Sequence, residues 1–435
     1  MTTILIIPML LFFLFTNQQI KDEKLKLLLQ LFIPFIIGIS LYLYLPVRSS
    51  SFPEFNWGWV SRNFDKFWYH FSGKQYQVWM FSGSEVIKNN FLIFLDSLPY
   101  QLGWLGLIPF IIGFIKLFKF NRNLFWGLII LIITCIIYAV NYSIHDIESY
   151  FSTAFIGFIL FTAVGIYFLT QINKKYILFS PIVPIISLII NYSTNDHSDD
   201  YIVEEYTKLL FKKIEPNAII ISSQWDYWVS AAWYLQRIEK FRPDVVIIDK
   251  ELLRRTWYLE QLKRWYSKRI SLCQQSIDDY LIDLELFESG QEYSPISIQR
   301  KFINLLNCFV NSNYGKFPIY ITLDIIETEP DMAKDYEKAA TGFAFKLIEK
   351  GKIEKVNIDD LDIIKLKISI TKNKGHLVDG IKALTALNFV NIARYTLKNG
   401  DYQTSRKALE KAYLIDPENK FVIDAINDFK KYKFE

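Results

Sequence analysis

The chain has 435 residues, of which 51% are hydrophobic and 17% aromatic, so it is too long for one compact domain. Its net charge of +4 comes from mixed signs without a long basic run, which gives nucleic-acid binding no support. The three cysteines and four histidines show no metal-type spacing, so we expect no bound metal.

Six apolar segments predict membrane-spanning helices, because a spanning helix needs about 20 mostly apolar residues. They are residues 1–17, 28–47, 100–118, 123–141, 150–170 and 176–191. Three of the links between them are basic: Lys21, Lys24 and Lys26; Lys116, Lys119 and Arg122; Lys174 and Lys175. The positive-inside rule makes these links cytoplasmic. We therefore expect a multi-pass protein of the plasma (inner) membrane whose loops 48–99 and 142–149, and everything after about residue 191, are extracytoplasmic.

This topology places Met1 on the outer side without a basic flank, so we expect an odd number of helices upstream of it. The spans contain almost no ionisable residues, whereas transporters usually carry charged groups at mid-membrane depth. The sequence therefore argues against transport and directs the search for chemistry to the outward loops.

The loop 48–99 is long and rich in polar and aromatic residues, as functional loops often are. Arg48 follows a predicted span, where its guanidinium can bind a phosphate or simply anchor the helix end. The other candidates in the loop are His70, Lys74, Gln75 and Tyr76, with Trp68 and Trp79 beside them. Such a cluster suits a sugar or a lipid headgroup, or an interfacial helix with its aromatic face in the bilayer. Residues 86–98 also predict an interfacial amphipathic helix.

The short loop 141–149 contains His145, Asp146 and Glu148. Two carboxylates and an imidazole at a membrane surface can supply a general base or a metal ligand. The alternative is a solvated turn between two helices.

Residues 192–375 predict a soluble α/β domain. Buried strands are expected at 217–223, 244–249 and 317–323, with helices at 226–238 and around 251–266 between them. No glycine-rich phosphate loop follows these strands, so nucleotide binding is unsupported. Cys135 lies within an apolar run, in the core or facing lipid, and Cys273 and Cys308 could form a disulfide outside the cytoplasm.

Residues 376–435 predict a helical segment similar to a tetratricopeptide repeat (TPR). Between residues 385 and 418, nine residues fall at positions expected within the 34-residue period of that repeat: Phe389, Ile392, Ala393, Gly400, Tyr402, Ser405, Leu409, Ala412 and Pro417. One repeat rarely stands alone, so we expect it to pack on the α/β layer or on a partner.

Three ordered segments resemble a bacterial family of multi-spanning membrane proteins that is related to a transmembrane protein O-mannosyltransferase of animals. They are LYLYLPVRSSSFPEFNWG with FWYHFSGKQYQVWMFSG, then SIHDIESYF, then SSQWDYWVSAAWYLQRIEKFRPDVVIID followed by LLRRTWYLEQL. The resemblance covers approximately residues 30–270 and the terminal repeat. It implies a membrane glycosyltransferase of the GT-C type that takes a sugar from a polyprenyl-phosphate carrier and attaches it to Ser or Thr of an exported protein.

The resemblance also implies roles for residues. Arg48 faces the donor phosphate, His70, Lys74, Gln75 and Tyr76 line the site, and Asp146 and Glu148 flank it. Full members carry an N-terminal region whose first outward loop supplies an acidic catalytic motif, and this sequence has no equivalent before residue 28. The catalytic residue is therefore unknown, with Asp146 and Glu148 as candidates. The turn SSQWD retains Asp226 but departs from the acidic turn of relatives.

The leading interpretation is the C-terminal portion of such a glycosyltransferase, transferring a mannose-like sugar. Its partners would be membrane lipid, the lipid-linked sugar, the acceptor protein and an N-terminal half, and it would need no cofactor. The alternative is a non-catalytic membrane scaffold that binds a partner protein through the α/β and TPR-like regions.

Overall fold

The computed structural model describes residues 2–16, 24–56, 58 and 60–432, and leaves the side chains of Thr2, Thr3, Leu25, Gln75 and Tyr432 undescribed. The chain divides into two compact units. The first, which we call the membrane unit, is Met1–Ser51 with Val60–Ser198, and the second, the sheet unit, is Phe52–Trp59 with Asp199–Glu435. The short segment 52–59 therefore belongs to the sheet unit, although both of its flanks belong to the membrane unit.

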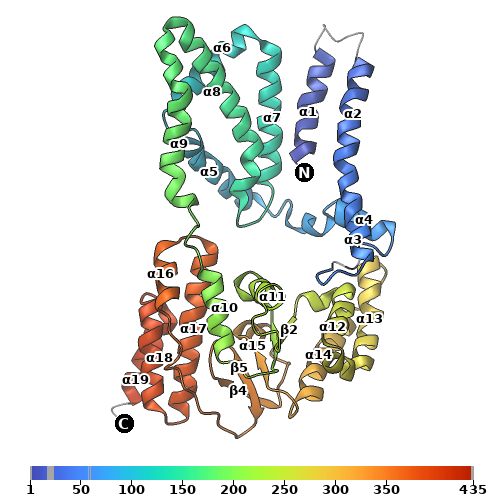
Figure 1. The fold of residues 1–435 in the computed structure, drawn as a ribbon, viewed down its shortest axis with the longest axis vertical. Coiled ribbons are helices and arrows are strands. Elements are labelled where there is room, and N and C mark those ends of the chain that lie inside the picture. The colour runs from blue at the N-terminus through green and yellow to red at the C-terminus, as the bar shows by residue number, and fades with distance from the viewer. Residues whose placement is uncertain (1, 17–23, 57, 59, 433–435) are drawn as a thin grey trace. The chain divides into compact units, whose positions relative to one another are not determined.

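The membrane unit is helical (Figure 1). Its helices are α1 (Thr2–Thr16), α2 (Lys24–Ser40), α3 (Tyr44–Ser50), α4 (Phe64–Phe71), α5 (Ser84–Gln101), α6 (Leu107–Phe120), α7 (Arg122–Val140), α8 (Ser152–Ile172) and α9 (Phe179–Asn195). The short 3-10 helices η2 (Leu41–Leu43), η3 (Lys74–Trp79), η4 (Ile147–Phe151) and η5 (Lys174–Leu178) connect them. The expected helix at 86–98 is present as the longer α5.

Among the described residues, four helical stretches are long and apolar enough to cross a membrane. They are Lys26–Ser50, Arg122–Val140, Ile147–Ile172 and Lys174–Asn195. The chain is therefore a membrane protein. The other two predicted spans correspond to α1 and α6, which have 15 and 14 residues and are short for a bilayer crossing. The six-span topology stays a prediction.

Close helix packing in the membrane unit depends on glycine. A Cβ on Gly113 of α6 would lie 1.8 Å from the Phe161 carbonyl oxygen of α8, and one on Gly165 would lie 1.7 Å from the Pro109 oxygen. Only residues without a side chain let the two backbones approach this closely, which is how small residues act in membrane helix pairs. The aromatic core around this crossing includes Phe125, which is 5% exposed. Cys135 is fully buried in that core.

The sheet unit contains a five-stranded sheet in the order β2-β1-β3-β5-β4. Strands β1 (Ile219–Ser222), β2 (Val246–Asp249) and β3 (Ile319–Ile321) run parallel, and β4 (Tyr336–Ala340) and β5 (Phe345–Glu349) extend the sheet antiparallel. All residues of the three parallel strands are buried. Continuous β-branched runs are typical of parallel strands covered on both faces, and the three predicted strands are confirmed. The β4–β5 hairpin was not predicted.

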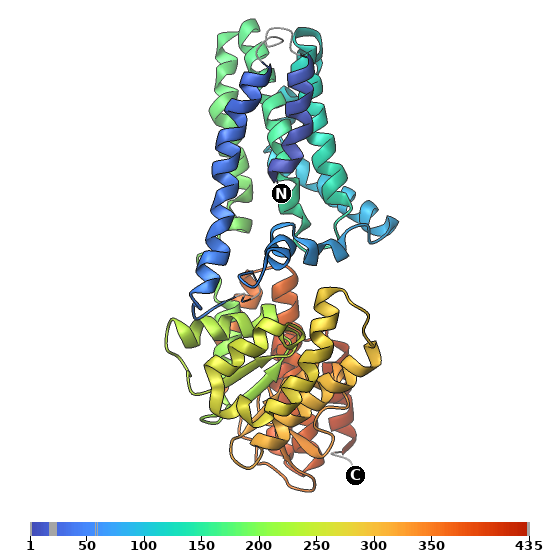
Figure 2. The same cartoon turned by 90° about the vertical axis from the view of Figure 1, so that its right-hand side faces the viewer.

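Helices lie on opposite sides of this sheet in both views (Figures 1 and 2). On one side are α12 (Thr256–Ile270), α13 (Gln274–Ser289) and α14 (Pro295–Asn313). On the other are α16 (Ile364–Lys372), α17 (His376–Lys398), α18 (Tyr402–Ile415) and α19 (Lys420–Tyr432). The remaining helices are α10 (Ile202–Lys212), α11 (Ser230–Arg237), which follows a π-helical turn at Trp225–Val229, and α15 (Leu323–Thr328).

The predicted terminal helices occur as the antiparallel pair α17 and α18, with Gly400 at φ +81° in the turn between them. Ala393, Ser405 and Ala412 are buried, and the Ser405 hydroxyl donates a hydrogen bond to the Ala393 oxygen at 2.9 Å. Small side chains thus allow the two helices to pack closely. Assignment of the pair as a TPR stays a prediction.

A disulfide joins Cys273 to Cys308, 35 residues apart. It links the start of α13 to α14 within the sheet unit. Such bonds persist in oxidising compartments and are rare in the cytosol. The extracytoplasmic location of the sheet unit stays a prediction.

Candidate functional site

Arg48 lies in the last turn of α3, so the helix continues beyond the predicted end of the span. Its side chain is exposed, and Nη1 donates a hydrogen bond to the Ser51 hydroxyl oxygen at 3.1 Å. The position suits either a helix-end anchor or a phosphate ligand, because a guanidinium has five N–H donors and can bind more than one acceptor.

His70 lies in α4, which Asn63 caps by accepting a hydrogen bond from the Lys66 backbone N–H at 2.9 Å. The next residue, Phe71, packs edge-to-face on Tyr42 at 4.9 Å, which joins α4 to the helix before Arg48. Burial lowers the pKa of His70, and its Nδ1 atom is buried without a hydrogen-bond partner among the described residues. Burial thus favours the neutral form of the imidazole.

Lys74 and Tyr76 lie in η3, where both side chains are exposed and Lys74 Nζ is 5.9 Å from the centre of the Tyr69 ring. The Tyr76 ring is 5.7 Å from the Trp79 ring, which in turn is 6.4 Å from Tyr142. Gln75 lies in the same turn, and its side chain is outside the described part. This aromatic series links loop 48–99 to loop 142–149.

Backbone pairing joins loops 48–99 and 142–149. Met80 and Tyr142 form an isolated antiparallel bridge, with the Ser143 N–H donating to the Trp79 oxygen at 2.9 Å. The buried Asn90 amide of α5 donates to the Val140 and Tyr142 carbonyl oxygens at 3.2 and 2.9 Å. These bonds satisfy carbonyl groups at the end of α7, where the helix can no longer do so.

Loop 141–149, which we call the acidic loop, directly follows α7. His145, Asp146 and Glu148 lie on its outer side, whereas Ile147 between them is 1% exposed and anchors the loop in the core. The structure therefore brings Tyr76 and the acidic loop onto connected segments at one end of the bundle. In the described part of the chain, no hydrogen bond or ion pair joins Arg48 to His70, Lys74 or the acidic loop.

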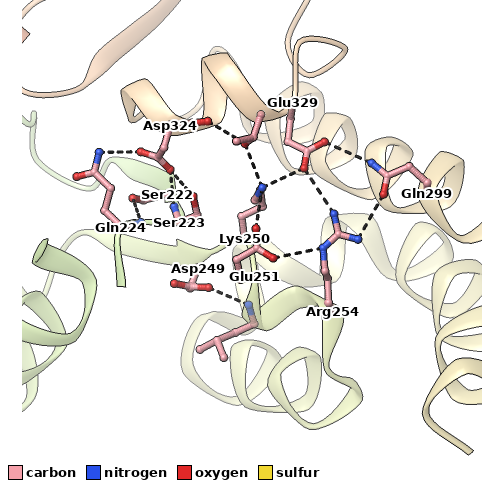
Figure 3. A network of polar contacts seen from close by, with 12 residues as sticks. Ser222, Ser223, Gln224, Asp249, Lys250, Glu251, Arg254, Gln299, Asp324 and Glu329 are labelled. Atoms are coloured by element: carbon pink, nitrogen blue, oxygen red, sulfur yellow. Dashed lines mark hydrogen bonds and ion pairs between the residues drawn. The ribbon is translucent and has the colours of Figure 1, made fainter. Parts of the chain in front are cut away.

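A second polar cluster, at the carboxyl ends of the parallel strands, was not singled out from the sequence (Figure 3). Asp324 follows β3, and its carboxylate accepts hydrogen bonds from the Ser223 backbone N–H at 2.8 Å and hydroxyl at 2.6 Å, and from Gln224 Nε2 at 2.7 Å. Ser222 Oγ accepts from Trp228 Nε1 at 2.9 Å. The SSQWD turn is thus held by a carboxylate about 100 residues away, while Asp226 is exposed.

Lys250, directly after β2, forms the other half of this cluster (Figure 3). Its Nζ atom lies 3.0 Å from Glu329 and 2.8 Å from Glu251, and donates to the Thr328 hydroxyl at 3.1 Å. Arg254 lies 3.6 Å from the same Glu329 oxygen. The side chains of Lys250 and Glu329 are only 4% and 6% exposed, so this is a buried ion pair with several hydrogen bonds. Removing one partner of such a pair leaves an uncompensated buried charge.

Asp249 lies opposite Ser222 in the parallel ladder. It is 1% exposed; one carboxylate oxygen accepts from the Leu252 N–H at 2.8 Å, and Oδ2 has no partner among the described residues. Burial raises the pKa of Asp249 to about 6. In open α/β sheets, ligands bind at the carboxyl ends of the strands. The most buried groups here bond mainly to one another, so the cluster chiefly fixes the strand ends.

The segment 52–59 is a further feature that sequence reasoning missed. The Asn56 backbone N–H donates to Gln261 Oε1 at 3.0 Å, and Trp265 Nε1 donates to the backbone carbonyl oxygen of Glu54 at 3.1 Å. Glu54 forms an ion pair with Arg237 at 2.7 Å. The dense aromatic content of this segment was the available signal, because Phe55 packs on Trp265 at 5.7 Å.

Comparison with known proteins supports the resemblance seen in the sequence. Residues 203–397 match the family described as TMEM260-associated domain 2. The chain is 26% identical over 285 residues to mouse (Mus musculus) "Protein O-mannosyl-transferase TMEM260", covering 60% of this chain and 40% of that protein. It is 23% identical over 406 residues to "Protein O-mannosyl-transferase tmem260" of Dictyostelium discoideum, covering 81% of this chain and 46% of that protein. No solved structure matches. The chain thus spans less than half the length of these two relatives, and it is similar to membrane proteins named as protein O-mannosyl-transferases.

Proposed function

We propose that this chain is the C-terminal portion of a membrane glycosyltransferase that moves a mannose-like sugar from a polyprenyl-phosphate carrier to Ser or Thr of exported proteins. The observation that carries the proposal is the similarity, over 81% of the chain, to a protein named as a protein O-mannosyl-transferase. The joined outward loops support it, because they present Tyr76 and two carboxylates on connected segments at one end of the helical bundle.

The reaction needs a base and a group that stabilises the leaving phosphate. An acceptor hydroxyl oxygen attacks the anomeric carbon, the bond from that carbon to the phosphate oxygen breaks, and the hydroxyl proton passes to a base. Asp146 and Glu148 are the candidate bases within this chain. The leaving polyprenyl phosphate carries negative charge, which the Arg48 guanidinium can stabilise through paired hydrogen bonds.

The aromatic and polar loop would hold the substrates. Sugar rings have apolar faces that pack on aromatic side chains, and the exposed Tyr76 and Trp79 offer such surfaces. Lys74 adds a positive charge in the same turn, and His70 is assigned to the site by resemblance. Gln75 is assigned to the site by resemblance.

The test measures transfer of radiolabelled mannose from a polyprenyl-phosphate carrier to a peptide that contains Ser and Thr. The membranes come from cells in which the gene has been deleted and replaced by a wild-type or variant copy. Arg48→Ala and Asp146→Ala should each lower transfer by at least about tenfold, as expected for loss of transition-state charge stabilisation. Lys88→Ala removes an exposed cation from the first turns of α5 and is the matched control. Unchanged transfer in both site variants would refute the site assignment, and absence of any transfer by wild type would refute the function.

A scaffold role is the second candidate, favoured by apolar residues exposed on the terminal helices. Tyr402 and Tyr413 of α18 are each 53% exposed, and Phe421 of α19 is 56% exposed. A scaffold would lose capture of its partner protein when residues 385–435 are deleted, while the Arg48→Ala variant would behave as wild type.

A further inference from the structure

A cavity of about 470 Å³ lies in the sheet unit, lined by residues at the ends of α11 and α12. Segment 52–59 contributes Glu54 to its wall. The wall also contains four cationic side chains and a second carboxylate: Arg237, Lys240, Lys268, Arg269 and Asp244. The volume falls within the range of about 300–1,000 Å³ that is common for small-molecule sites. The charges of the lining decide what kind of molecule suits it.

Both carboxylates in the wall already have cationic partners. Asp244 accepts hydrogen bonds from Arg242 Nε and Nη2, each at 3.0 Å, and from the Asn217 N–H at 2.9 Å. Glu54 lies 2.7 Å from Arg237 Nη1. Among the described residues, neither carboxylate forms an ion pair with the other three cations of the lining.

Those three cations contact only neutral groups or solvent. Lys240 Nζ donates to the Arg237 carbonyl oxygen at 2.7 Å, and Arg269 Nη1 donates to the Asp244 carbonyl oxygen at 3.4 Å. The Arg269 guanidinium also lies 4.4 Å from the centre of the Phe317 ring. Lys268 is exposed. In the described part of the chain, none of the three forms an ion pair, so the cavity has a local excess of positive charge.

Ring contacts fix the position of the Arg237 side chain, but its guanidinium does not use all of its hydrogen-bond donors. Its guanidinium stacks 4.3 Å from the centre of the Trp265 ring, and Nη2 donates to the Tyr266 hydroxyl at 3.3 Å. Its Nε atom is buried without a partner among the described residues. Nε and Nη2 form the edge of a guanidinium that binds oxyanions through two parallel hydrogen bonds. A buried donor without a partner is unfavourable. An oxyanion that took the place of the Tyr266 hydroxyl would accept hydrogen bonds from both Nη2 and Nε.

We propose that this cavity binds a phosphate or pyrophosphate group, carried by a small solute or by a lipid headgroup. The excess of three cations, the guanidinium edge of Arg237 and the volume of the cavity support it. Glu54 competes with the ligand for Arg237, so removing the Glu54 charge should strengthen binding. The proposal goes beyond the proposed function, since the cavity lies in the sheet unit and contains none of the residues assigned to sugar transfer.

The test titrates inorganic pyrophosphate into the full chain in a neutral detergent by isothermal calorimetry. A saturable site should appear in wild type, and Lys268→Ala/Arg269→Ala should weaken it by at least about tenfold, because two charges near the ligand are lost. Glu54→Gln should tighten it several-fold. Lys263→Ala is the matched control: it removes a cation from the same helix α12 that does not line the cavity, and it should leave affinity unchanged.

A second titration distinguishes the two sources of phosphate. Dihexanoyl phosphatidylglycerol, compared with dihexanoyl phosphatidylcholine, tests a lipid headgroup; binding of the former alone, with the same response to the variants, assigns the site to lipid. Binding of pyrophosphate without the lipid assigns it to a soluble phosphate ester. The proposal is wrong if neither probe binds. It is also wrong if Lys263→Ala weakens binding as much as the double variant does. Should the double variant fail to fold, unchanged affinity in Glu54→Gln would also overturn it.

Discussion

Asp249 allows a quantitative test of the sheet unit, because its carboxylate is buried with one oxygen unpartnered among the described residues. Burial raises its pKa from the ordinary value of 3.8 to about 6. The acid is therefore harder to ionise in the folded protein than in the unfolded chain. Replacing it with Asn keeps the shape of the side chain and the acceptor for the Leu252 N–H, but removes the ionisation.

The sign follows from the higher pKa in the folded state. The associated stability is fully present below about pH 3.8 and is lost as pH rises through about 6, because the folded protein then holds a buried charge. The difference between the two pKa values corresponds to about 3 kcal/mol in total, of which about half is lost between pH 5 and pH 8. The Asp249→Asn variant has no ionisable group at this position, so its stability does not show this loss as the pH rises.

The assay is thermal unfolding of the full chain in detergent, followed by intrinsic tryptophan fluorescence at pH 5 and pH 8. The Tm of Asp249→Asn minus that of wild type should be higher at pH 8 than at pH 5 by about 3–6 °C, using about 2–4 °C per kcal/mol for a unit of this size. Comparing the two pH values cancels any constant effect of the amide on packing.

Asp226→Asn is the control, since it removes an exposed carboxylate from the turn after β1. A Tm difference for Asp249→Asn that does not change with pH would refute the reasoning. The same would follow if Asp226→Asn gave an equal change, because the effect would then not depend on burial.

Three further predictions concern stability. Asn90→Ala removes two buried hydrogen bonds between α5 and the end of α7, and should lower the free energy of unfolding by about 1–3 kcal/mol, measured as a lower Tm. Gly113→Leu should prevent close packing of α6 on α8 and abolish a monodisperse gel-filtration peak, whereas Gly38→Leu, at a position where an added Cβ would meet no neighbouring atom within 4 Å, should leave that peak unchanged. Reduction of the Cys273–Cys308 bond, which spans 35 residues, should destabilise the sheet unit by up to about 4 kcal/mol in the loop-entropy treatment. Equal thermal unfolding with and without reductant, with both thiols alkylated in the reduced sample, would contradict this last expectation.

The three parallel strands were predictable because their information is local. Residues 219–222 form a buried, mostly β-branched run. Such a run indicates a buried strand from its own composition, whatever residues pack against it. The apolar stretches 123–141 and 150–170 likewise indicate spans from their own composition, and helices occur there as α7 and α8. The positions of α17 and α18 followed from the match of residues 385–418 to the spacing of a tetratricopeptide repeat.

The site was only partly predictable. The polar and aromatic composition of the outward loops singled out Tyr76 and the acidic loop, but nothing local in either segment specified that Met80 would pair with Tyr142. Arg48 and His70 were chosen by type and position, and their contacts depend on how α3 and α4 pack.

Sequence alone thus determined where the chain is apolar, where it forms strands and helices, and which loops carry reactive side chains, since these follow from short-range composition and periodicity. Tertiary structure decided that segment 52–59 packs on the sheet unit, that Asp324 binds the turn at Ser223 from 101 residues away, and that Asp249 is buried. The physical reason is that a hydrogen bond, an ion pair or a raised pKa depends on the partner and on the exclusion of water, and both are supplied by residues distant in sequence.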